Sequence, residues 1–186
     1  MKSIISIFMN KKRCNWVNDD EIYINYHDQE WGIPTHDDKE LFEMLILESF
    51  QAGLSWITIL KKRENFKKAF DDFDVEKVAS YDEVKVEELR SNEGIIRHKG
   101  KINSTINNAK VFIEIQKEFG SFDKYIWGFT DGEIIKSEYL TESDLSRDIS
   151  KDLKKRGMKF VGPTIIYSYL ESIGIIDNHE KNCFKF

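Results

Sequence analysis

The sequence contains few of the residues that mark secreted, membrane-spanning or turn-rich proteins. Its 186 residues include only two cysteines and two prolines. Two cysteines near opposite ends do not form the disulfide framework of a small secreted domain. No apolar run approaches the roughly 20 residues that span a bilayer, and the short apolar patch within residues 1–8 is not followed by a cleavage site. These absences predict a cytoplasmic protein without a membrane partner.

The scarcity of proline and glycine also predicts a helical protein. Hydrophobic residues make up 40% of the chain, enough for one core. Ile102, Ile106, Ala109 and Ile113 recur at helical spacing before Gly120. Further helices are expected over residues 37–50, 55–70, 121–127, 145–153 and 163–174, with short ones after Asp74 and Asp82. Residues 14–32 suggest short turns, and residues 131–132 predict a small hairpin. The fold class is therefore all-α.

The charges are unevenly distributed along a chain whose net charge is −5. Residues 71–93 are strongly acidic, whereas basic residues gather at 61–68, 97–101 and 151–159. Either these clusters are solvated helix faces, or one side of the molecule binds a polyanion.

Glu48 is an unusual residue in the helix expected over residues 37–50. It follows Leu41 by seven residues and Met44 by four, so it shares their apolar helix face. A buried carboxylate is costly unless it is paired, so this position requires a structural partner or a ligand. Trp56 follows closely, and a carboxylate beside an indole suits a planar, electron-poor ring.

Each cysteine has a histidine at a spacing that suits a metal site. Cys14 precedes His27 by 13 residues, and His179 precedes Cys183 by four. Tetrahedral zinc favours such a Cys2His2 set. Four protein ligands leave no position for an activated water, so this zinc would be structural and would join the two ends of the chain. Buried free thiols are the alternative.

A glycine-containing turn separates the last two expected helices. Gly157 ends the first helix, and Gly162 precedes Pro163, which suits the first position of the second helix. Backbone N–H groups at such a turn can bind a phosphate. A plain corner between two helices is the alternative. The basic residues that flank the turn are Lys154, Lys155, Arg156 and Lys159.

Seven short motifs occur together between Cys14 and Cys183. Their set and order closely resemble the type I 3-methyladenine DNA glycosylases of bacteria. The motifs are CNW at 14–16, YINYHDQEWG at 23–32, LE at 47–48, QAGLSW at 51–56, GIIRHKGK at 94–101, KFVGPT at 159–164 and HEKNC at 179–183.

The resemblance implies a helix–hairpin–helix glycosylase fold whose N- and C-terminal region is held by zinc. Residues 1–13 would be an extension, and residues 14–186 a single domain of two packed helical lobes. Cys14, His27, His179 and Cys183 would bind one structural zinc. The base would be bound by Glu48, the expected catalytic residue, with Tyr26, Trp56, Trp16, Tyr23 and Trp31. DNA-backbone contacts would come from Gly157, Lys159, Gly162 and Thr164.

The function implied by the resemblance is removal of 3-methyladenine from alkylated double-stranded DNA by a monomeric, monofunctional enzyme. Methylation at N3 makes adenine cationic and a good leaving group, so the enzyme must mainly extrude, stack and hydrogen-bond the base. Free 3-methyladenine and an abasic site would be the products. Two alternatives are a non-catalytic, zinc-stapled DNA-binding module and a zinc hydrolase, although a closed ligand set argues against the hydrolase.

Overall fold

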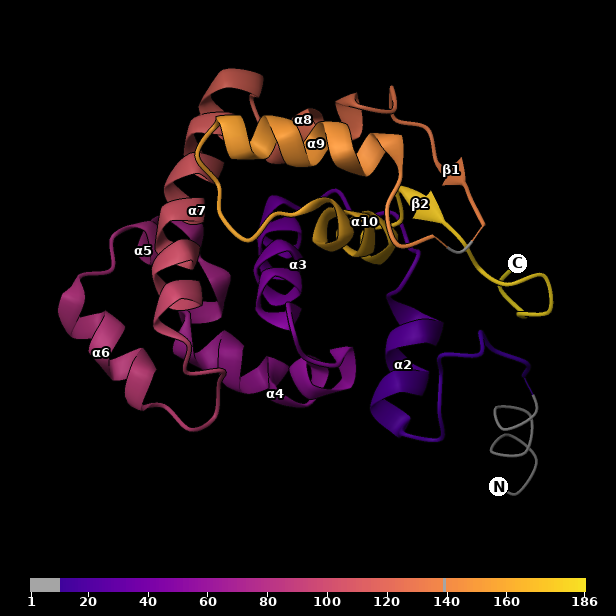
Figure 1. Cartoon of the computed structure of the whole chain (residues 1–186), viewed down its shortest axis with the longest axis horizontal. Coiled ribbons are helices and arrows are strands. Elements are labelled where there is room, and N and C mark those ends of the chain that lie inside the picture. Colours follow the sequence, from indigo (N-terminus) through magenta and orange to yellow (C-terminus); the bar gives the residue numbers. More distant parts are fainter. Residues whose placement is uncertain (1–10, 139) are drawn as a thin grey trace.

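The computed structural model describes residues 11–138 and 140–186. Helices dominate this part of the chain, and the described strands form a single two-stranded sheet (Figure 1). The elements in order are α2 (Glu21–Gln29), α3 (Asp38–Gln51), α4 (Trp56–Ala69), the 3-10 turn η1 (Asp71–Phe73), α5 (Val75–Ala79), α6 (Glu83–Ser91), α7 (Lys99–Phe119), α8 (Phe122–Gly128), β1 (Ile135–Lys136), α9 (Asp144–Lys155), α10 (Pro163–Ser172) and β2 (Ile176–Asp177).

Local capping explains where several helices begin and end. The carboxylates of Asp37, Asp74 and Asp82 each accept a hydrogen bond from the first turn of the following helix. Gly120 ends α7 in the left-handed conformation. These boundaries confirm the helices expected over 37–50, after the two aspartates, and up to residue 120. Ser55 precedes α4 as expected, but its hydroxyl contacts Thr58 Oγ1 rather than a backbone N–H.

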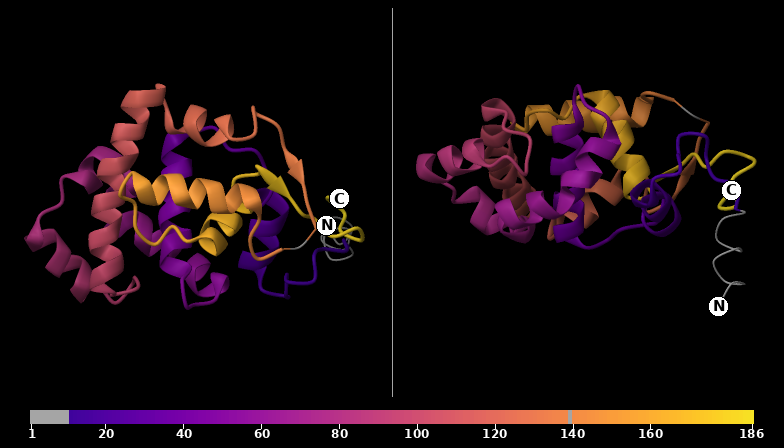
Figure 2. Two further views of the ribbon diagram at one scale, coloured as in Figure 1. Left: turned by 45° about the horizontal axis from the view of Figure 1, so that its top comes forward. Right: turned by 90° about the horizontal axis from the view of Figure 1, so that it is seen from below.

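Helix α3 forms the centre of the fold. It contacts α4, α7, α8 and α10, and every residue from Leu41 to Phe50 is buried. A helix enclosed on all sides has no solvent-facing side, so the single apolar stripe expected here is only part of its buried surface. Helices α5 and α6 lie at one end of the molecule, and β1, β2 and the C-terminal segment lie at the other (Figures 1 and 2).

Two local expectations were wrong. Residues 14–32 contain the nine-residue helix α2, capped by Asp20, rather than short turns alone. Residues 131–132 do form a turn, but no hairpin follows it in the described chain. Instead β1 pairs in parallel with β2, and the N–H of Ile135 donates to the carbonyl of Ile175 at 2.8 Å. The fold is therefore mostly helical, with a small sheet that joins distant segments.

The first described residues pack against the end of the chain. The carbonyl of Lys12 accepts a hydrogen bond from the N–H of Phe184 at 2.8 Å, and Arg13 forms an ion pair with Asp28 at 2.6 Å. Within the expected extension, residues 1–10 lie outside the described residues. Across the described chain, no helix combines the length and apolar character needed to cross a membrane.

Candidate active site and metal centre

A cavity of about 300 Å³ opens among α2, α3, the start of α4 and α10. This volume is in the range of small-molecule sites. The structure brings together here Glu48 and the five aromatic residues expected at the base site: Trp16, Tyr23, Tyr26, Trp31 and Trp56. Sequence reasoning assigned no role to three further residues of its lining, Gln51, Ser168 and Glu171.

Aromatic rings form much of the cavity wall. The ring centroids of Tyr26 and Trp56 lie 5.5 Å apart, and Trp16 packs edge-on against Trp31 at 5.1 Å. Tyr23 has an additional positioning contact, because its hydroxyl accepts a hydrogen bond from the N–H of Ile57 at 3.1 Å. This bond holds the first turn of α4, where Trp56 is located, against α2.

Glu48 lies deep in this wall and is only 3% exposed. Its Oε2 atom is buried and makes no hydrogen bond, and the indole Nε1 of Trp56 is likewise buried without a partner. Burial raises the pKa of Glu48 well above its usual value, and the nearby carboxyl of Glu171 raises it further. The site therefore contains one acceptor and one donor that nothing in the described chain satisfies, as expected at a ligand position.

Glu171 is the second carboxyl of the cavity and comes from α10. The Nδ2 group of Asn178 donates a hydrogen bond to it, and burial raises its pKa to about 8. Among the described residues, neither Glu48 nor Glu171 has a lysine or arginine within ion-pair distance. The arginine of this region, Arg63, is instead paired with Glu30 and Glu43, at 2.5 and 2.6 Å.

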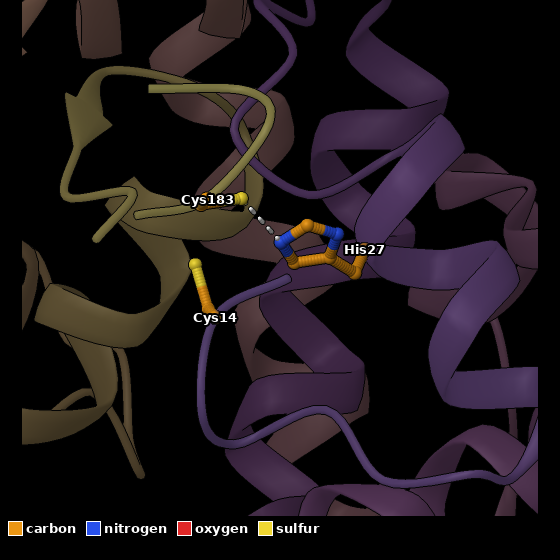
Figure 3. Close-up of side chains that lie close together, drawn as sticks. All are labelled: Cys14, His27 and Cys183. Atoms are coloured by element: carbon orange, nitrogen blue, oxygen red, sulfur yellow. Dashed lines mark hydrogen bonds between the residues drawn. The ribbon is translucent and has the colours of Figure 1, made fainter. Parts of the chain in front are cut away.

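Three of the four expected metal ligands converge, and the fourth lies beside them. Cys14, His27 and Cys183 place one ligand atom each within 4.8 Å of one another, and Cys183 Sγ lies 3.4 Å from His27 Nε2 (Figure 3). The fourth expected ligand, His179, lies beside this cluster, with its ring 5.4 Å from that of His27. All four side chains are buried, and Nε2 of His179 has no hydrogen-bond partner.

The surroundings of the two histidines suit a metal. Asp28 lies 2.8 Å from Nδ1 of His27, and Asp177 lies 2.7 Å from Nδ1 of His179. A carboxylate on Nδ1 leaves Nε2 available as a ligand and orients the ring. Gly32 is required for this arrangement, because a Cβ atom there would lie 2.6 Å from the ring of His179. The buried Cys/His/Cys cluster, with the unpartnered Nε2 of His179 beside it, is a donor set that fits zinc.

The metal-ligand cluster supports one wall of the aromatic cavity. Trp31 packs against His27 at 5.8 Å and against His179 at 4.6 Å between ring centroids. Trp16 lies 5.5 Å from His27. Two residues that line the cavity are therefore in direct contact with the two histidines.

The turn between α9 and α10 is fixed from the side of α7. Asn108 donates to the carbonyl of Lys159 and accepts from its N–H, at 2.8 and 2.9 Å. Gly157 requires glycine, because its φ is +101°. Gly162 does not, because its φ is −64° and a Cβ atom there would meet nothing within 4 Å. No hydrogen bond in the described chain uses the N–H groups of Gly162 or Thr164.

Several residues of the basic clusters are engaged within the protein, among them Arg63, Arg156 and Lys101. Arg156 forms ion pairs with Glu118 and Asp152, at 2.6 and 2.7 Å. Lys101 is buried, and its Nζ donates to the carbonyls of Phe50 and Ala52 at the end of α3. The exposed basic residues beside the turn are Lys154, Lys155 and Lys159.

Comparisons with known proteins agree with this site. The methyladenine glycosylase family matches residues 16–186. DNA-3-methyladenine glycosylase 1 of Escherichia coli (strain K12) is 46% identical over 178 residues, 92% of this chain and 95% of that protein. A crystal structure of 3-methyladenine DNA glycosylase I superposes with a TM-score of 0.90 at 45% identity, covering 93% of this chain and 98% of the other. A variant of 3-methyladenine DNA glycosylase I in complex with 3-methyladenine gives 0.89 at 39% identity, covering 92% and 96%.

The helical fold and its aromatic, acidic cavity are those of a base-excision DNA glycosylase. More particularly, the chain belongs to the methyladenine glycosylase family.

Proposed function

We propose that the protein hydrolyses the N-glycosidic bond of 3-methyladenine in alkylated double-stranded DNA and leaves an abasic site. The observation that carries this proposal is the unpartnered carboxyl of Glu48 inside an aromatic cavity. A buried acid without a counter-cation is costly, and a cationic ring would supply the missing charge. The family membership and the 3-methyladenine complex of a similar protein support the same substrate.

Different cavity residues stack on the base and form hydrogen bonds with it. The target nucleotide must leave the helix stack to reach a buried pocket. Tyr26 and Trp56 provide aromatic faces for stacking, and Trp16, Tyr23 and Trp31 complete the wall. Glu48 accepts a hydrogen bond from the exocyclic amino group, while its negative charge stabilises the cationic ring.

The chemistry requires little beyond this binding. N3-methylation has already weakened the glycosidic bond, so stabilisation of the extruded base accounts for much of the catalysis. No lysine lines the cavity within the described residues. No aspartate follows Gly162 in the α9–α10 turn. We therefore assign hydrolysis without a Schiff base, and we assign no water-activating base.

The α9–α10 turn is proposed as the DNA-backbone contact of a helix–hairpin–helix motif. The free N–H groups of Gly162 and Thr164, the open space beside Gly162 and the exposed Lys159 suit a phosphate. Because the protein itself does not need glycine at position 162, close approach of the DNA backbone provides the reason for it. Gly157 shapes the turn.

One structural zinc is proposed at Cys14, His27, His179 and Cys183. Zinc bound there would hold the two ends of the chain together and stabilise the wall formed by Trp16 and Trp31. The four protein ligands would saturate the metal, so its contribution is to stability rather than to hydrolysis. We further propose that the enzyme acts as a monomer in the cytoplasm.

The decisive test is release of free base from methylated duplex DNA, measured by chromatography. Wild-type protein should release 3-methyladenine. Glu48→Gln should lose most of this activity while its melting temperature holds or rises, because an unpaired buried acid is removed. If the folded fraction of Glu48→Gln keeps full specific activity, Glu48 is only a structural residue.

Glu43→Gln is a matched control on the same helix. Glu43 is also buried, but its carboxylate is paired with Arg63 outside the cavity. This variant should lose stability because Arg63 loses a partner, and its folded fraction should stay active. Binding of DNA by wild-type protein without any base release would instead support a non-catalytic module. A zinc hydrolase would instead require a bound zinc with an open coordination position, and its activity would be lost when the zinc is removed.

A further inference from the structure

Glu171 shares with Glu48 the features that single out a ligand-binding acid. It lies on α10, where most neighbours are apolar, and it lines the same cavity as Glu48. Its exposed fraction is 9%. Ser168, three residues earlier, also lines the cavity, so this face of α10 is directed at the cavity.

The position of Glu171 is set by two contacts from other segments. Its carboxylate accepts a hydrogen bond from Nδ2 of Asn178, and its backbone carbonyl accepts one from the N–H of Gly32 at 3.1 Å. Gly32 follows Trp31, another cavity residue. The side chain is therefore held in place before any ligand enters, as a recognition group requires.

Two buried carboxyls in one cavity are more than a structural role explains. Burial raises the pKa of both, the carboxyl of Glu171 raises that of Glu48 further, and no basic side chain of the described chain compensates them. If position 171 had only a structural role, an apolar residue there would avoid the cost of burying a carboxyl. The arrangement instead favours a ligand that brings positive charge with it.

We propose that Glu171 is a second base-contacting carboxyl that, with Glu48, selects cationic over neutral bases. This inference rests on the proposed function. With a cationic methylated base in the cavity, one carboxylate balances the charge of the ring. The second carboxyl provides a hydrogen-bonding group from the α10 side. A neutral base of the same shape gains the stacking but leaves the acids uncompensated.

The test compares a cationic and a neutral ligand of the same shape. Single-turnover excision of 3-methyladenine from duplex DNA reports on the cationic base. Binding of a duplex that contains 3-methyl-3-deazaadenine, a neutral isostere, reports on shape and stacking. Glu171→Gln keeps the volume and the acceptor for Asn178, and it removes only the carboxylate. Excision should fall about tenfold or more, because hydrogen bonds to charged groups are worth roughly 1.5–3 kcal/mol. Affinity for the neutral duplex should be unchanged or higher.

Two further variants separate charge from structure. Glu171→Asp retains the carboxylate and should preserve the preference for the cationic base, even where excision and neutral-duplex binding both decrease. Glu64→Gln removes one negative charge from the exposed face of α4, outside the cavity, and should change neither measurement.

Equal loss of excision and of neutral-duplex binding in Glu171→Gln would overturn the inference, because such a loss indicates a positioning role for α10. The inference would also be overturned if the ratio of excision rate to neutral-duplex affinity stayed at the wild-type value in both Glu171→Gln and Glu171→Asp. Failure of the proposed function is distinguishable, since wild-type protein would then release no 3-methyladenine at all.

Discussion

The acid at position 171 should make the folded protein less stable as the pH rises. Burial raises the pKa of Glu171 to about 8, from an ordinary value of 4.5. Between these values the folded chain holds a proton that the unfolded chain has released. The ionisation of Glu171 therefore costs no stability below about pH 4.5. Its full cost in the free energy of unfolding is reached above about pH 8.

The magnitude follows from the length of this interval. Each pH unit between the two pKa values costs about 1.4 kcal/mol in the free energy of unfolding. From pH 4.5 to pH 7 the cost of Glu171 is about 3 kcal/mol. Glu171→Gln removes this titration and keeps the acceptor for Asn178. The variant should therefore be more stable than wild type by about 3 kcal/mol at pH 7, and by almost nothing at pH 4.5.

The assay is urea unfolding of the two proteins at matched zinc content, repeated at pH intervals between 4.5 and 8.5. The difference in the free energy of unfolding reports on position 171 and on the carboxyl of Glu48, whose pKa Glu171 raises. Acids remote from the cavity titrate equally in both proteins. A difference that is constant across this range would refute the reasoning. Greater stability of the wild type at pH 7 would refute it as well, since the acid would then have a favourable partner.

Two other substitutions test the ends of the chain and the α9–α10 turn. Cys183→Ala should lower the zinc content and the melting temperature, since structural zinc contributes on the order of 10–16 kcal/mol of apparent binding free energy in small zinc peptides. Elemental analysis and calorimetry measure both. Gly162→Val should fold normally because the space beside Gly162 is open, yet it should weaken duplex binding for all sequences and reduce the salt dependence, as binding titrations at several salt concentrations would reveal.

Each of these predictions has a clear contrary result. Protein purified without chelator that holds no zinc would remove the structural metal from the proposal. Gly162→Val with unchanged duplex affinity and salt slope would leave the turn as a corner between helices. Free 3-methyladenine should bind this variant normally, which controls for damage to the cavity.

Features that depend on neighbouring residues were predictable from the sequence. The aspartate caps of α3, α5 and α6 bond to N–H groups two or three residues away, and Gly120 ends its own helix. The residues of the buried cluster, Cys14, His27 and Cys183, were identifiable because the donor chemistry of cysteine and histidine is specific. The unusual position of Glu48 was visible for a similar reason, since a carboxylate on an apolar helix face is costly to bury unless it has a partner or a ligand.

Features that depend on distant partners were missed or mistaken. The strand β1 pairs with β2, far along the chain, so the local turn at 131–132 suggested a hairpin that does not form. The buried face of α2 consists of Tyr26 and His27, which pack against aromatic rings of the cavity wall instead of forming an aliphatic stripe. Lys101 was counted as a surface charge, but it binds the carbonyls at the end of α3.

The sequence by itself determined most of the helices, several of their caps and the identity of the donor and aromatic side chains, because these depend on short-range spacing and on residue chemistry. Only the tertiary structure decided which of them meet. Helix α3 is buried on every side, so its own pattern marked Glu48 as anomalous without showing which groups surround it. The packing of α10 against α3 then places Glu171 in that cavity, and the joined ends of the chain bring Cys14, His27 and Cys183 together.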